Sequence, residues 1–131
     1  MAEKAALVTG ASSGIGYAIA EALGDEGYAL TVAARRPEKL EAAAERLRKA
    51  GYEVTAAAGD LGRTEAIRAA VETHRERYRR LDVLVNNAGV GIGQYADELT
   101  EKAIDIQVAT NLRSIFLFYR EALPLLREAG A

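Results

Sequence analysis

Three glycines near the N-terminus, Gly10, Gly14 and Gly16, follow a short apolar run in the spacing Gly-x-x-x-Gly-x-Gly. A glycine-rich turn between a strand and a helix lets backbone N–H groups approach an anion at the positive end of the helix. Such a loop predicts a binding site for the pyrophosphate of a dinucleotide, and a tight turn without a ligand is the alternative. Its position between a predicted strand and a predicted helix favours the phosphate site. The residues predicted to bind the phosphates are Gly10, Ser12, Ser13, Gly14, Ile15 and Gly16.

Two consecutive arginines, Arg35 and Arg36, come directly after the second predicted strand. In a dinucleotide-binding sheet this place lies beside the adenosine ribose, where NAD-binding proteins carry an acidic residue. Here no carboxylate is available, and a guanidinium group suits a 2′-phosphate because its planar N–H groups form paired hydrogen bonds. The sequence therefore predicts NADP as the cofactor, with NAD less favoured. A solvated basic patch shared with Lys39 is the other interpretation of these arginines.

The residues that must position these groups form apolar strand-like segments that alternate with helical ones. Strands are expected over residues 5–8, 28–33, 53–58 and 82–85; helices are expected after the glycine loop, from about residues 37 and 64, and over about 100–129. This order predicts an α/β fold of the Rossmann type, a doubly wound parallel sheet with helices on both faces. The strand order should be 3-2-1-4, with the sheet incomplete at its C-terminal side. We predict a single dinucleotide-binding domain over residues 1–131.

The composition limits the possible partners. The chain has 131 residues, half of them apolar, and a formal net charge of −2, so no overall positive field attracts nucleic acid or an anionic membrane. Without cysteine and with one histidine, His74, a disulfide framework or a metal site is not expected, and a structural role is expected for the histidine. No apolar run approaches the length of a membrane span, and no signal-peptide pattern begins the chain. A cytoplasmic protein is therefore expected.

Two further motifs accompany the glycine loop. Asn86-Asn87-Ala88-Gly89 stands at the end of the fourth predicted strand, and Asn111 lies within Thr110-Asn111-Leu112 on the final helix. Together with Thr9-Gly10-x-x-x-Gly14-x-Gly16, they resemble the motifs of the short-chain dehydrogenase/reductase family over essentially the whole chain. The hydroxyl groups expected to contact phosphate or to cap the helix are those of Thr9, Ser12 and Ser13.

The resemblance implies roles for further residues. Asn111 is expected to be the catalytic asparagine that anchors a water molecule in the proton relay. Asp60 would reach the adenine, with the Leu61 backbone lining the same pocket, unless Asp60 is only a turn or capping residue. Asn86 is interpreted as structural, with its side chain bonding to neighbouring backbone. The residues expected beside the ribose and the nicotinamide are Asn87, Ala88 and Gly89.

The activity that the resemblance implies is hydride transfer between NADP and the carbonyl or hydroxyl carbon of a small-molecule substrate, as in an oxidoreductase. The family's Tyr-x-x-x-Lys pair and its serine are not found, because none of the six tyrosines is followed by lysine at the fourth position. We therefore expect the natural chain to continue past Ala131. The alternatives are a truncated module that binds nucleotide or a partner without catalysis, and a Rossmann domain of another class, such as a methyltransferase.

The final predicted helix carries a wide apolar face, wider than a four-stranded sheet can easily bury. In the resembling family this helix lies at a subunit interface, so either a partner chain or the half of the family's chain that is missing here is expected to cover it. We predict a homo-oligomer through the final helix, with ordinary core packing as the alternative. The residues of this apolar face are Ile104, Val108, Leu112, Ile115, Phe116, Tyr119 and Leu123.

Overall fold

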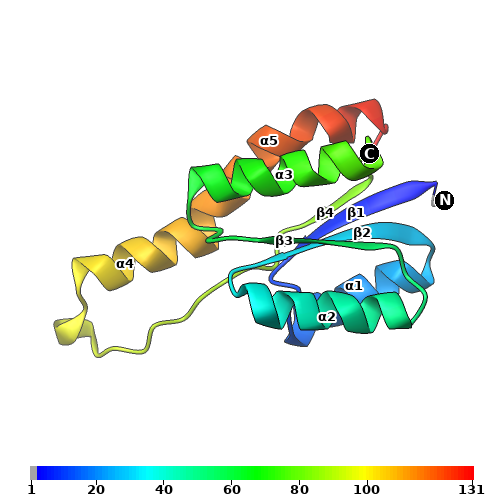
Figure 1. Cartoon of the computed structure of the whole chain (residues 1–131). Helices are drawn as coiled ribbons and strands as arrows, with labels where there is room; N and C mark the ends of the chain where they lie inside the picture. The colour runs from blue at the N-terminus through cyan, green and yellow to red at the C-terminus, as the bar shows by residue number, and fades with distance from the viewer. Residues whose placement is uncertain (1–2) are drawn as a thin grey trace.

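The computed structural model describes residues 3–131 and has a four-stranded parallel sheet at its centre (Figure 1). Ala6 of the first strand lies opposite Leu30 on one side and Val83 on the other. The strand order β3-β2-β1-β4 confirms the predicted order and leaves β4 at an edge of an open sheet. The strands are β1 (Lys4–Thr9), β2 (Tyr28–Ala34), β3 (Val54–Ala58) and β4 (Val83–Val85).

Helices cover both faces of the sheet, as the alternation of the sequence predicts (Figure 1). On one face lie α1 (Gly14–Asp25) and α2 (Pro37–Lys49), and on the other lie α3 (Thr64–Tyr78) and α5 (Ser114–Glu128). A loop with the short 3-10 helix η1 (Ala96–Glu98) leads from β4 to α4 (Glu101–Val108), which projects beyond the sheet. The doubly wound α/β fold is therefore confirmed.

The core consists of two apolar layers, one on each side of the sheet. Leu30 and Val32 of β2 pack with Leu40 and Leu47 of α2 in one layer. In the other layer, Leu7 of β1 packs with residues that α3 and α5 contribute, Ile67, Val71 and Phe118 among them. Because both faces of β1 and β2 are buried, their sequences are continuous apolar runs rather than alternating ones.

The helical segment predicted over residues 100–129 is interrupted by a π-helical turn, η2 (Ala109–Arg113), between α4 and α5. The Ser114 amide donates to the carbonyl of Ala109, five residues earlier, so it does not bond to Thr110. The Ser114 hydroxyl, which is buried, donates to the Thr110 carbonyl at 2.6 Å instead. This hydroxyl satisfies an acceptor that the wider turn releases. Over residues 3–131, no helix is both long and apolar enough to cross a membrane.

Candidate functional site

A cleft of about 250 Å³ opens at the carboxyl ends of the strands. In a parallel sheet ligands bind at this edge, where the strand order reverses, and here the reversal falls between β1 and β4. Most of the predicted site residues meet in the cleft; those outside its lining are Thr9, Gly14, Ile15, Gly16, Asn87 and Asn111. The residues that line it are Gly10, Ser12, Ser13, Ala34, Arg35, Arg36, Lys39, Asp60, Leu61, Ala88, Gly89, Val90 and Thr110.

The glycine loop needs glycine at two positions because other backbone approaches closely. A Cβ on Gly10, which has a φ of 64°, would lie 2.9 Å from the Ala88 Cα. A Cβ on Gly16 would lie 2.2 Å from the Gly10 carbonyl oxygen and 2.5 Å from Nδ2 of Asn87. Gly14 differs, because its φ is 59° but nothing lies within 4 Å of the place a Cβ would take. The loop is thus packed against the segment after β4 on one side and open on the other.

Thr9 joins this loop to the segment that follows β4. Its buried hydroxyl accepts hydrogen bonds from the amides of Asn87 and Ala88, both at 2.9 Å, and donates to the Val85 carbonyl at 3.3 Å. The expectation that Thr9 contacts phosphate or caps the helix is therefore wrong. All the hydrogen bonds of its hydroxyl go to backbone groups at and after the end of β4. The sequence alone does not reveal that these groups lie beside Thr9.

The capping role of Ser13 is wrong, while its phosphate contact stays a prediction, and the role expected of Asn86 also differs. The bond to neighbouring backbone that was expected of Asn86 is made by Asn87, whose amide donates to the Gly10 carbonyl at 3.2 Å. Ser13 occupies the N-cap position of α1, but its hydroxyl makes no capping bond. Because the first backbone N–H groups of a helix have no partner within it, those at the start of α1 can bind an anion.

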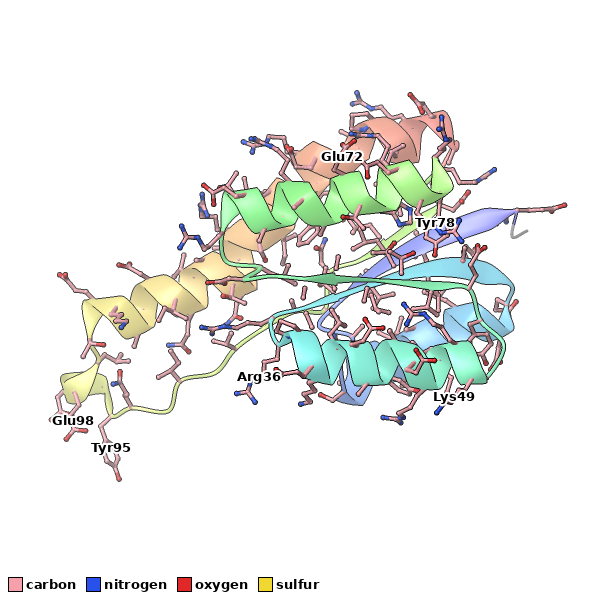
Figure 2. The ribbon with its side chains drawn as sticks, in the orientation of Figure 1. Arg36, Lys49, Glu72, Tyr78, Tyr95 and Glu98 are labelled. Atoms are coloured by element: carbon pink, nitrogen blue, oxygen red, sulfur yellow. The ribbon has the colours of Figure 1, made fainter. Side chains whose placement is uncertain are left out.

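The arginines lie at the β2 end of the cleft, and Arg36 projects from the start of α2 (Figure 2). Both are exposed, as is Lys39. Across the part of the chain that the structure describes, none of these three cations forms an ion pair. Asp60 is the acidic residue in the cleft lining, and it lies two residues after the end of β3. The charge at the end of β2 is therefore available to an anionic ligand.

Asp60 has a structural role as well as a place in the cleft. Its Oδ1 accepts a hydrogen bond from the Gly62 amide at 3.0 Å, which forms a turn. The turn interpretation of Asp60 is thus confirmed, and the adenine contact stays a prediction. The neighbouring Leu61 is buried in the layer beneath α3 and α5.

Asn111 lies in η2, and its side chain forms hydrogen bonds with the backbone of Val90. Its Oδ1 accepts from the Val90 amide and its Nδ2 donates to the Val90 carbonyl, both at 2.7 Å. Gly89 comes directly before Val90, and a Cβ on Gly89 would lie 3.2 Å from the Asn111 Oδ1. The carboxamide therefore holds the segment that lines the cleft on the β4 side.

His74 has the structural role predicted for it. It is fully buried, its Nδ1 lies 2.7 Å from the Thr31 hydroxyl, and its Nε2 lies 2.8 Å from the Arg80 carbonyl. Because a carbonyl only accepts, Nε2 carries the proton and Nδ1 accepts from the threonine. Burial lowers the pKa of His74. Among the described residues, no group of three or more metal-binding side chains is found.

The family model for short chain dehydrogenases matches residues 4–131. This chain belongs to the short-chain dehydrogenase family. The 3-oxoacyl-[acyl-carrier-protein] reductase FabG of Staphylococcus aureus is 36% identical over 131 residues, which cover 98% of this chain and 53% of the relative. The chain spans about half the length of the curated relatives that it matches, with shares of 45% to 53%.

Solved structures of other short-chain dehydrogenases have the same fold. L-sorbose reductase from Gluconobacter frateurii, complexed with NADPH and L-sorbose, superposes with a TM-score of 0.93 at 33% identity, over 99% of this chain and 50% of that one. A metagenomic short-chain oxidoreductase in complex with NADP gives a TM-score of 0.90 at 38% identity, over 98% of this chain and 59% of that one.

Sequence reasoning missed several residues of this short-chain dehydrogenase's cleft. Val90, which follows the Asn86–Gly89 motif, and Thr110, which precedes Asn111 in its motif, both line it, although neither was predicted as a site residue. Gln107 was also missed, and its Oε1 accepts from the Ile92 amide in the loop that continues from Val90. Its position four residues before Asn111, on the same side of a helix, was a signal available in the sequence.

Proposed function

We propose that the protein is an NADP-dependent oxidoreductase of the short-chain dehydrogenase family and that residues 1–131 form its nucleotide-binding domain. The observation that supports this most strongly is the cleft, which combines a glycine loop at a helix N-terminus with exposed Arg35 and Arg36 at the end of β2. The sorbose reductase and the metagenomic oxidoreductase were solved with NADPH and NADP. The proposed substrate is a small carbonyl or hydroxyl compound.

The glycine loop fits a pyrophosphate. The first turn of α1 has no acidic side chain, and Ser13 at its N-cap makes no side-chain capping bond, so the N–H groups there are open to an anion. The place that a Cβ on Gly14 would take is free of other atoms. A negatively charged group therefore meets N–H donors and no competing carboxylate at this end of the cleft.

In this proposal, the adenosine part of the cofactor binds on the β2 side of the cleft and the nicotinamide part on the β4 side. Arg35, assisted by Arg36, would bind the 2′-phosphate on the β2 side, and Asp60 and Leu61 would line the adenine pocket. On the β4 side the cofactor's ribose and nicotinamide would lie beside Asn87, Ala88 and Gly89.

The bound nicotinamide would supply or accept the hydride that defines the reaction. We propose that Asn111 serves this reaction by fixing Val90, because both polar atoms of its carboxamide already bond to that residue. A water molecule in a proton relay would then bind the main chain of Asn111 or the N–H group and oxygen lone pair that its carboxamide has left. We propose that the proton donor comes from a segment that corresponds to the part of the longer relatives, such as the FabG reductase, with which residues 1–131 do not align.

The test is a fluorescence titration of the 131-residue chain with NADPH and with NADH, repeated on Arg35→Ala. Loss of a charge-assisted contact should weaken NADPH binding about tenfold or more and leave NADH binding unchanged, because NADH has no 2′-phosphate. Arg127→Ala, at the far end of α5, is the matched control and should bind as the wild type does. Equal affinity for the two cofactors in the wild type would contradict the assignment of NADP.

We also propose a homo-oligomer through α4 and α5. The apolar face predicted on this segment is largely exposed in the single chain: Leu112 is 54%, Phe116 is 67% and Tyr119 is 52% exposed. A surface of this kind marks an interaction site on a soluble domain.

A further inference from the structure

The loop from β4 to α4 is held by two carboxamides that come from one helical face. Asn111 bonds both backbone groups of Val90, and the Oε1 of Gln107 accepts from the Ile92 amide at 3.2 Å. The Nε2 of Gln107 donates to the Ala103 carbonyl at 3.2 Å, one helical turn earlier. This second bond fixes the direction of the Gln107 carboxamide and leaves its oxygen facing the loop.

The distance between Asn111 and Gln107 along the helix is similar to the distance between their partners, Val90 and Ile92, along the loop. Gln107 and Asn111 are four residues apart, which corresponds to about 6 Å along a helix. Val90 and Ile92 are two residues apart, which would correspond to about 6.6 Å in an extended chain, where the amides of residues i and i+2 lie on one side. A shift of the loop by one residue would therefore break the contacts of both Asn111 and Gln107.

Little else restrains this part of the loop. Residues 86–95 form no helix or strand, and a Cβ at Gly91 or Gly93 would have nothing within 4 Å. Gly89 and Val90 nevertheless line the cleft on the β4 side. The position of that wall thus depends on the contacts made by Asn111 and Gln107.

We propose that Gln107 is a positioning residue that, with Asn111, holds the loop over residues 89–93 against α4 and η2 and so fixes the nicotinamide side of the cleft. The inference rests on the proposed function, because it takes the β4 side of the cleft as the place of the nicotinamide. Gln107 touches neither the cofactor nor the substrate in this proposal, and it acts through the backbone of Ile92.

The first test needs no cofactor and measures hydrogen exchange of backbone amides by NMR. In Gln107→Met, which keeps the length of the side chain but loses the strong acceptor, the Ile92 amide should exchange about three- to tenfold faster. Gln107→Glu keeps an acceptor oxygen but loses the donor to the Ala103 carbonyl, so it should restore part of the protection of Ile92. Gln94→Met is the matched control, because Gln94 accepts from the Thr100 amide in the same loop and not from Ile92. Unchanged exchange of Ile92 in Gln107→Met would overturn the proposal.

The second test separates the two halves of the cofactor. Gln107→Met should bind NADPH about three- to tenfold more weakly, with a smaller blue shift of the nicotinamide emission, and should bind adenosine 2′,5′-bisphosphate as the wild type does. Gln107→Glu should recover part of the emission shift. An equal loss for both ligands, or an unchanged emission shift, would overturn the positioning role. If the wild type binds neither ligand, the proposed function fails, and the exchange of Ile92 still decides whether Gln107 holds the loop.

Discussion

Gly16 and Gly14 lie two residues apart in the phosphate loop, yet substitution should affect them in different ways. In Gly16→Ala the new methyl group would overlap the Gly10 carbonyl and the Asn87 amide, which are themselves hydrogen-bonded to each other. We expect the loop to open, with a loss of about 1–3 kcal/mol in the free energy of unfolding and at least a tenfold loss of NADPH affinity. Urea denaturation and cofactor titration measure the two effects.

Gly14→Ala is the comparison, because its methyl group would contact no other atom. The positive φ alone should lower the free energy of unfolding, by about 1–2 kcal/mol. Gly14→Asn should cost less than Gly14→Ala, since asparagine tolerates the left-handed conformation better. Equal NADPH affinity in Gly16→Ala and the wild type would show that the close approach at Gly16 does not shape the site.

The buried histidine makes stability depend on pH. Burial lowers the pKa of His74 below the ordinary 6.5, so the unfolded chain takes up a proton in acid before the folded chain does. The free energy of unfolding should therefore be constant with respect to this group above about pH 6.5 and fall below it, by at most about 1.4 kcal/mol per pH unit. The nearby Arg80–Asp82 ion pair and the packed Tyr78 ring belong to the same environment.

Urea denaturation at pH 7 and pH 5 measures this dependence, with His74→Gln as the comparison. The carboxylates titrate in both proteins, so the difference between the two pH slopes isolates the histidine. Identical slopes would mean that His74 does not contribute to acid destabilisation.

The π-helical turn η2 should depend on the Ser114 hydroxyl. Ser114→Ala leaves the Thr110 carbonyl without the donor that replaces the missing backbone bond. We expect a loss of about 1 kcal/mol in the free energy of unfolding and faster hydrogen exchange of the Val90 amide, because Asn111 lies within the turn. Ser13→Ala, whose hydroxyl makes no capping bond, is the control and should leave both quantities unchanged. Retention of Val90 protection in Ser114→Ala would argue against the role of this hydroxyl.

The helices and strands could be predicted because their apolar periodicity reflects burial directly, as Leu40 and Leu47 of α2 illustrate. The side of α1 that packs against the sheet could not be predicted in this way. Its apolar spacing includes Ile15, which is 74% exposed, whereas the buried face is made by Gly16, Ala20 and Gly24. Small residues mark close helix packing, and a Cβ on Gly24 would lie 2.7 Å from the Tyr52 ring, a contact between distant segments that periodicity does not contain.

The site shows the same division between local and distant information. The glycine loop and Arg35 were predicted to meet because both follow strands of one parallel sheet, and both line the cleft. The bonds of Thr9 to Asn87 and Ala88 connect residues nearly eighty positions apart, so their assignment required the strand pairing itself. The π-helical turn has no composition of its own, and so the direction of Asn111 could not be derived from helical spacing.

The exposed apolar face of α4 and α5 should determine the association of the chain. Phe116→Glu places a charge at its most exposed position, and we expect it to abolish the oligomer while leaving the far-ultraviolet circular dichroism unchanged. Sedimentation velocity at micromolar concentrations measures the oligomeric state. Tyr95→Glu is the control, because Tyr95 is also exposed but projects from the loop before α4 (Figure 2). A wild-type chain that stays monomeric at every concentration would contradict the proposed interface.

The position of β1 inside the sheet has a consequence for synthesis. Lys4–Thr9 leaves the ribosome before the other three strands, yet its two neighbours are β2 and the much later β4, and Ala6 pairs with Val83. The nascent strand can therefore gain one neighbour once residue 34 has emerged, while its other edge stays unpaired until about residue 85. An apolar open edge invites pairing with other chains, so chaperone contact should concentrate in this interval. No nucleotide can protect the growing chain during it, because the cleft requires the loop after β4.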